Sequence, residues 1–214
     1  YGAMFMGLGL IFYGMAAMGS AMAPLRTHEG FAELLQSLQN PVLGMLAGAV
    51  FTALVQSSSA TIGLSVVMAT QGLLSLPAGI AILFGAKIGT GITAILAAIG
   101  KPKDAKRAAA VHVLFNVLGA VIWLPFIAQL AGLAETVSPV TAHLEGVDRL
   151  AEEVPRQIAN AATIWATANT LLFLPFAGLF ATIAIKIIPD RPVEEKAIIR
   201  PRYLDDELIQ VPSM

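Results

Sequence analysis

The chain has 214 residues, of which 57% are hydrophobic and 13% are charged, and its formal net charge is −1. Soluble domains carry about 25% charged residues, so this composition predicts an integral membrane protein and argues against nucleic-acid binding. The chain has no cysteine, which excludes disulfides and thiol chemistry. The three histidines show no metal-ligand spacing, and no nucleophile–base pair points to an enzyme. The length fits one membrane unit of a few spans.

The first 40 residues predict one span followed by one surface helix. Residues 1–24 are apolar and rich in Gly and Met, and they are just long enough to cross a hydrocarbon core about 30 Å thick. Residues 25–40 combine charged side chains with apolar ones at helical spacing. They predict an amphipathic helix that starts near Gly30 and lies on the membrane surface or on the protein.

A polar cluster divides the next apolar stretch, residues 41–74. The cluster reads Gln56-Ser57-Ser58-Ser59-Ala60-Thr61, and each apolar half beside it has about 14 residues, too few to cross alone. Hydrocarbon offers such side chains no hydrogen-bond partner, and polar residues at membrane depth usually mark a substrate or ion site. We predict a re-entrant hairpin over about 41–74, with the cluster as the floor of a transport site. One broken, tilted span is the alternative.

A second interruption lies in the following span, residues 77–100. Its middle reads Gly85-Ala86-Lys87-Ile88-Gly89-Thr90-Gly91, which predicts a polar, breakable stretch at mid-depth. Two interrupted segments in neighbouring spans are typical of a transporter's binding site. Lys87 lies about 14 residues before the next loop, too far to snorkel easily to the interface. We expect its ammonium to contact an anion or to replace a sodium ion.

A basic loop sets the predicted orientation. Residues 101–107 carry four positive charges, so the positive-inside rule places this loop in the cytoplasm. Residues 108–133 are then expected to cross outward, residues 135–157 to form an acidic loop, and residues 158–188 to return. The tail, residues 189–214, is polar and is expected to be a cytoplasmic linker.

The sequence Leu-Pro-Phe occurs twice, at residues 124–126 and 174–176. The first copy follows His112-Val-Leu-Phe-Asn116, and the second follows Ala162-Thr-Ile-Trp-Ala166 at the same distance. This internal echo predicts two similarly kinked helices. The polar His and Asn of the first copy are both Ala in the second.

Three motifs carry a family resemblance. They are Gln-Ser-Ser-Ser-Ala-Thr at 56–61, Gly-Ala-Lys-Ile-Gly-Thr at 85–90 and Ala-Val-His-Val-Leu-Phe-Asn at 110–116. Together they resemble the bacterial branch of the type II sodium-dependent phosphate cotransporters. That family carries two inverted repeats, each with a Gln-Ser-Ser-Ser hairpin. The resemblance implies that residues 1–188 are the second repeat with its closing helices, an all-α multi-pass bundle and one half of an inverted-repeat transporter.

The resemblance implies sodium-coupled symport of inorganic phosphate by alternating access across the inner (plasma) membrane, with sodium as coupling ion and no cofactor. For phosphate it implies Gln56, Ser57, Ser58 and Ser59, to which Lys87 is added because of its charge. For sodium it implies Ser58, Ser59, Thr61, Thr90 and Asn116, with no other metal. Serine and glutamine side chains both donate and accept hydrogen bonds, and helix ends at a hairpin tip favour anions.

Two positions depart from the family's pattern. The usual Asn of its Gly-Ala-Asn-Ile-Gly-Thr motif is Lys87 here. The usual His-Thr-x-Phe-Asn of its last helix is Ala-Thr-Ile-Trp-Ala at residues 162–166. Both departures bear on sodium stoichiometry and on the substrate.

The expected partners are phosphate, sodium and membrane lipid, and also a second half of the transporter. A start in the middle of an element, at Tyr1, predicts that the first repeat of the same protein is missing, and a homodimer of two chains is the alternative. The tail is similar to the linker that leads, in bacterial members, into a PhoU-like domain. Two other functions stay open: transport of another oxyanion or with altered coupling, and anion sensing without transport.

Overall fold

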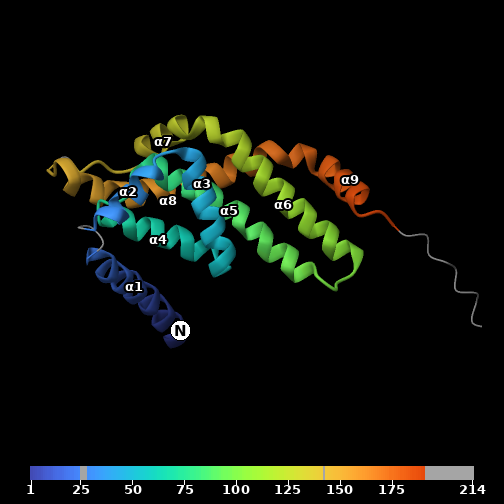
Figure 1. The fold of residues 1–214 in the computed structure, drawn as a ribbon, viewed down its shortest axis with the longest axis horizontal. Coiled ribbons are helices and arrows are strands. Elements are labelled where there is room, and N and C mark those ends of the chain that lie inside the picture. Colours follow the sequence, from blue (N-terminus) through green and yellow to red (C-terminus); the bar gives the residue numbers. More distant parts are fainter. Residues whose placement is uncertain (25–27, 142, 191–214) are drawn as a thin grey trace, which may run out of the picture.

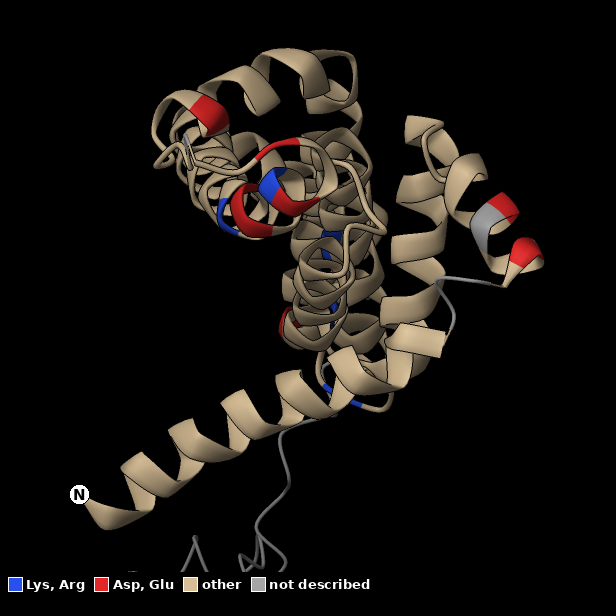
Figure 2. Cartoon of the chain, turned by 90° about the vertical axis from the view of Figure 1, so that its left-hand side faces the viewer, with Lys and Arg blue, Asp and Glu red and all other residues tan. Residues whose placement is uncertain are grey.

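The computed structural model describes residues 1–24, 28–141 and 143–190, and every regular element in those ranges is helical. Four stretches of the described residues are long and apolar enough to cross a membrane, which agrees with the predicted all-α membrane fold. They are Gly2–Met22, Leu76–Ala98, Lys103–Thr136 and Gly146–Ile187. In Figure 2 the helix marked N carries neither basic nor acidic residues along its length. The predicted linker lies outside the described residues from position 191 onward.

The elements follow one another in a simple order (Figure 1). They are α1 (Gly2–Met22), α2 (Glu29–Ser37), α3 (Pro41–Val55), α4 (Ser58–Thr70), α5 (Leu76–Ala98), α6 (Lys103–Trp123), η2 (Leu124–Phe126), α7 (Ile127–Thr136), α8 (Gly146–Phe173), η3 (Leu174–Phe176) and α9 (Ala177–Ile187). The predicted amphipathic helix corresponds to α2, which begins one residue before Gly30. Leu35 within α2 and Leu38 at its C-cap are buried, as the helical spacing predicts.

Helix α5 is the centre of the core, and it packs against α3, α4, α6 and α8. Its first half is apolar on every side, which is typical of a fully buried helix. Ile80 and Phe84 have no exposed surface. The ring of Phe84 lies 5.3 Å from that of Trp165 on α8, measured between centroids. Helix α1 is the opposite case: its only buried residue is Gly19, which lies against α4.

The internal echo is visible in the backbone. Both Leu-Pro-Phe copies, η2 and η3, form a short 3-10 turn between two α-helical segments. Proline has no backbone N–H, so the regular hydrogen-bond ladder cannot continue unchanged through either site. The equal spacing and the equal break confirm that α6 and the second half of α8 are locally similar helices.

The predicted acidic loop over 135–157 is wrong for most of its length, because α8 begins at Gly146. The charged residues there are compatible with a helix that starts outside the membrane. Glu153 is buried and accepts hydrogen bonds from the Thr141 backbone N–H at 2.6 Å and from Arg149 Nε at 3.0 Å. Arg149 and Glu153 are four residues apart, so they share one helix face.

Candidate functional site

Helices α3 and α4 form a helical hairpin within the segment predicted to be re-entrant, and their boundaries follow from local chemistry. Asn40 caps α3 by accepting the Val42 N–H at 2.9 Å, with Pro41 at the first helical position. Gln56 ends α3 in the left-handed region, with φ of 57°. Ser57 then caps α4 by accepting the Ala60 N–H at 3.2 Å. The chain therefore turns at the polar cluster.

The two ends of the hairpin meet. The Ser75 hydroxyl, after α4, donates to Gln39 Oε1, before α3, at 2.7 Å. The segment thus starts and finishes at the same end of the molecule, which favours a hairpin over one broken span. Helix α3 has 15 residues and a length of about 22 Å, whereas α5 has 23 residues and a length of about 34 Å. The hairpin is too short to cross a hydrocarbon core about 30 Å thick.

A buried hydroxyl pair joins the two arms just below the tip. Thr52 Oγ1 on α3 and Thr61 Oγ1 on α4 lie 2.6 Å apart, and both residues are buried. The Thr61 hydroxyl donates to the Ser57 carbonyl at 3.1 Å, so Thr52 is the donor within the pair. Thr61, a predicted sodium ligand, is therefore inside the hairpin. Thr52 was missed because a lone threonine in an apolar run carries no signal.

The tip itself is the most polar accessible feature of the hairpin. Gln56 and Ser59 are exposed, and Ser57 and Ser58 are half-buried. Within the described part of the chain, the side chains of Gln56, Ser58 and Ser59 make no hydrogen bond. The structure thus places four of the five residues predicted for phosphate in one turn, at the N-terminus of α4, and the fifth, Lys87, lies in α5. Three of their side chains are available to a ligand, together with the positive end of the helix dipole.

The second predicted interruption is wrong, because α5 is one continuous helix through Gly85 and Gly89. A side chain built on Gly85 would overlap the Met45 carbonyl of α3. One built on Gly89 would lie 2.6 Å from the Ala49 carbonyl oxygen. These glycines let the two helices touch backbone to backbone, as small residues do between membrane helices.

Helix α3 contributes glycines of its own to the same contact. A Cβ on Gly48 would overlap the Ile82 carbonyl, and one on Gly44 would lie 3.0 Å from Ala81 Cβ. Both helices thus carry a Gly-x-x-x-Gly pair, so one face of each is free of side chains. Thr90, also predicted as a sodium ligand, bonds within its own helix, to the Ala86 carbonyl at 2.9 Å.

Lys87 lies on a different side of α5 from α3. Residues two apart in a helix point in nearly opposite directions, and Lys87 is two residues from both Gly85 and Gly89. It shares a face with Gly91, which packs against Val113 of α6. Lys87 is half-buried and has no hydrogen bond or ion pair with any described residue. The structure therefore does not bring its ammonium to the tip on the α3 side.

Asn116 also lies away from the tip, buried on α6. Its Nδ2 donates to the His112 carbonyl at 2.8 Å and lies 3.2 Å from His112 Nε2. Since α5 and α6 run antiparallel with Gly91 opposite Val113, Asn116 is at about the depth of Lys87. In the described chain, no hydrogen bond joins any two of the predicted sodium ligands. Ser58 and Ser59 alone among them belong to the tip.

Asn169 is a buried polar residue for which the sequence predicts no role. It has no exposed surface, and neither of its amide atoms has a partner among the described residues. A Cβ on Gly119 of α6 would lie 2.6 Å from its Oδ1. Gly119 and Asn169 each precede Leu-Pro-Phe by five residues. The echo could have shown this pairing: the glycine of one copy makes room for the asparagine of the other.

Comparisons with known proteins show the family of the chain. The profile of a family described as Na+/Pi-cotransporter matches residues 10–148. An uncharacterized protein of Bacillus subtilis, YqeW, is 32% identical over 88% of this chain and 57% of its own length. A putative inorganic phosphate export protein of Salmonella typhimurium, YjbB, is 27% identical over 97% of this chain and 36% of its own length.

A mammalian relative matches a shorter part. Sodium-dependent phosphate transport protein 2A of Rattus norvegicus is 38% identical over 49% of this chain and 17% of its own length. No solved structure matches. This chain spans between about half and a third of the length of the bacterial relatives. The family is one of transporters, which confirms that the chain is not an enzyme. The chain is a multi-pass membrane protein that belongs to the Na+/Pi-cotransporter family.

Proposed function

We propose that the protein transports inorganic phosphate by sodium-coupled symport, with the tip of the α3–α4 hairpin as its phosphate site. The observation that carries this proposal is the tip itself. Gln56, Ser58 and Ser59 offer side chains with no hydrogen bond to any described residue, next to the N-terminus of α4. The names of the rat and Salmonella relatives, which concern sodium-dependent phosphate transport and phosphate export, support the substrate.

The chemistry of the tip suits reversible binding of an oxyanion. Serine hydroxyls and the free N–H groups of a helix start donate to phosphate oxygens, and the helix dipole favours negative charge. Burying a multiply charged anion without counter-charge is costly, and coupled sodium ions supply that charge. Hydroxyl and amide oxygens are suitable ligands for sodium, so Ser58 and Ser59 serve both ions in this proposal.

The remaining residues have weaker support as sodium ligands. The side chains of Thr61, Thr90 and Asn116 all bond within their own helix or hairpin. These bonds use O–H or N–H groups, so each side chain keeps oxygen lone pairs for an ion, and the support is weaker because the three residues lie outside the tip. Lys87 enters the proposal through its charge at mid-depth rather than through contact with the tip. A first repeat of the same protein, or the second chain of a homodimer, completes the site opposite the tip.

Transport is tested with the full-length protein in lipid vesicles. We expect radiolabelled phosphate to accumulate when a sodium gradient points inward and to stay near background when potassium replaces sodium. Phosphate binding without accumulation would favour an anion sensor over a transporter. Accumulation of sulfate in preference to phosphate would identify another oxyanion as the substrate.

The orientation that we propose is that of an inner-membrane protein with residues 101–107 and the tail in the cytoplasm. Accessibility labelling of Lys101 would test this orientation.

A second candidate is phosphate export with altered coupling. Two observations favour it: Lys87 is a fixed cation without a partner among the described residues, and the Salmonella relative is named as a putative exporter. Vesicles preloaded with labelled phosphate separate the candidates. Release that does not depend on sodium would support export, whereas sodium-dependent uptake would support symport.

A further inference from the structure

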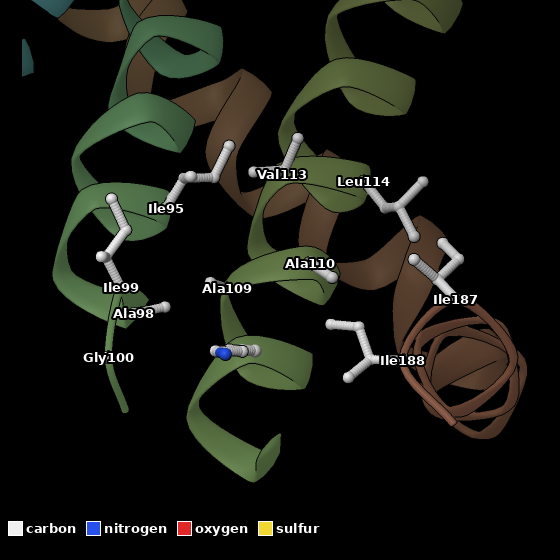
Figure 3. A pocket seen from close by; sticks show the side chains of 11 residues that line it. Ile95, Ala98, Ile99, Gly100, Ala109, Ala110, Val113, Leu114, Ile187 and Ile188 are labelled. Carbon is white, nitrogen blue, oxygen red and sulfur yellow. The ribbon is translucent and has the colours of Figure 1, made fainter. Parts of the chain in front are cut away.

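An apolar groove lies at the end of the molecule opposite the hairpin's start, and it does not belong to the phosphate site. It has a volume of about 540 Å³ and is formed by the last turns of α5, the first turns of α6 and the end of α9. Figure 3 shows the aliphatic side chains of Ile95, Val113, Leu114, Ile187 and Ile188 around it. The lining residues of α6 include alanines, whose small side chains leave space between these aliphatic side chains.

Among the described residues that line this groove, Lys106 is the one with a charged side chain. Lys106 is exposed and has no ion pair with any residue the structure describes. The neighbouring basic side chains, by contrast, have acidic partners. Arg107 pairs with Asp190 at 3.0 Å and with Asp104 at 3.2 Å, and Lys103 lies 3.7 Å from Asp190.

The two acidic side chains described near the groove, Asp104 and Asp190, thus already have basic partners. The hydrogen bond from Arg107 and its positive charge lower the pKa of Asp190, so this carboxylate is ionised and occupied. Arg107 also donates to the Ile188 carbonyl at 3.0 Å, which holds the end of α9 as one wall of the groove. No acidic residue of the described chain forms an ion pair with Lys106. The same is true of Lys101.

The groove lies where three candidate spans end. Helix α5 finishes at Ala98, α6 begins at Lys103 and α9 finishes at Ile187. Lipid headgroups lie at the ends of membrane spans, and the acyl chains lie beside their apolar sides. Basic pockets between membrane helices bind anionic headgroups at this level.

We propose that the groove binds an anionic phospholipid, with an acyl chain along the aliphatic walls and the phosphate at the Lys106 ammonium. The apolar lining fits a hydrocarbon chain, and the unpaired charge at its mouth selects an anionic headgroup over a zwitterionic one. A peptide segment would place backbone N–H and C=O groups against a lining that offers almost no hydrogen-bond partner, so the groove fits a lipid better.

Native mass spectrometry of the full-length protein tests this proposal. The protein is mixed with phosphatidylglycerol or with phosphatidylcholine of the same acyl chains, and the retained lipid is compared. We expect phosphatidylglycerol to be preferred, and Lys106→Gln to reduce that preference by about fivefold, the effect of one basic residue near an anionic surface. Ala110→Trp, which fills the groove, should reduce retention of both lipids.

Lys186→Gln is the matched control. Lys186 lies at the same end of the molecule, is exposed and does not line the groove, so this variant should keep the preference. If Ala110→Trp fails to fold, Ile99→Trp replaces it, because Ile99 lines the groove and is 66% exposed. Equal retention of the two lipids by the unmodified protein would overturn the proposal. So would an equal loss in Lys106→Gln and Lys186→Gln, or retention unaffected by a tryptophan in the groove.

Discussion

The hairpin tip and the glycine-rich stretch of α5 have the same signature in the sequence and opposite structures. Both place small and polar residues in the middle of an apolar segment. At Gln56 and Ser57 the backbone leaves the helix and polar side chains become available. Between Gly85 and Gly91 the helix continues, and the glycines are used for contact with α3. Serine at a turn can cap the next helix, whereas glycine removes a side chain where another backbone must approach.

The hairpin and α5 form one packed unit in which the tip and the glycine face have different roles. The tip is suited to binding, and the glycine face fixes where that tip lies along α5. Thr52 connects the two, since it bonds to Thr61 within the hairpin and a Cβ on Gly89 would lie 2.7 Å from its Cβ. Variants of the two regions should therefore fail in different ways, folding in one case and transport in the other.

The largest expected effect is loss of the folded protein in Gly85→Ala. The added methyl overlaps the Met45 carbonyl, and overpacking of this kind costs roughly 1–3 kcal/mol or more. Thermal unfolding in detergent measures the loss. Gly63→Ala on α4 is the control, because nothing lies within 4 Å of the added carbon there. If both variants were equally stable, the close contact between α3 and α5 would be wrong.

The next effect is loss of transport in a protein that still folds. Replacing both Ser58 and Ser59 by Ala should lower phosphate uptake by about tenfold or more, since one hydrogen bond to a charged group contributes roughly 1.5–3 kcal/mol. Uptake into vesicles is compared with the unfolding temperature of the same sample. Thr182→Val on the exposed side of α9 serves as a control. Normal uptake by the double variant would remove the tip from the site.

The variant Lys87→Asn tests whether the stretch between Gly85 and Gly91 also takes part in ion coupling. If the ammonium replaces a sodium ion, the variant should become more sodium-dependent, by at least about fivefold, the lower range of coupling between two ligands. The measurement is the initial rate of phosphate uptake against sodium concentration. If the dependence of uptake on sodium concentration were unchanged, the hypothesis that the Lys87 ammonium replaces a sodium ion would be wrong. The stretch would then have a packing role alone.

The smallest effect is expected for the threonine pair that joins the arms. Thr52→Val removes the donor to Thr61 but leaves the Thr61–Ser57 bond, so we expect a loss of about 1 kcal/mol in unfolding free energy. A double-mutant cycle with Thr61→Val isolates the contribution of the pair. A coupling energy near zero would mean that the arms are held by the glycine contact alone.

Several features of this protein can be deduced from local sequence. Composition and apolar length predict a helical membrane protein, and the polar cluster between two short apolar halves predicts where the segment 41–74 turns. The repeated Leu-Pro-Phe predicts two similar breaks, because the same residues flank a proline without a backbone N–H at both sites. Each of these depends on interactions within a few residues, so no knowledge of distant neighbours is needed.

The tertiary structure alone decided what the other residues do. A glycine in an apolar run can break a helix or admit a neighbour, and the presence of α3 beside α5 determined that Gly85 and Gly89 admit one. Lys87 and the hairpin were expected at one site, but the helical angle from Gly85 places the lysine on the α6 side. The packing of neighbouring helices likewise buries Thr61 and Asn169. The direction of a side chain relative to other helices depends on long-range packing, which the spacing of residues along one helix does not contain.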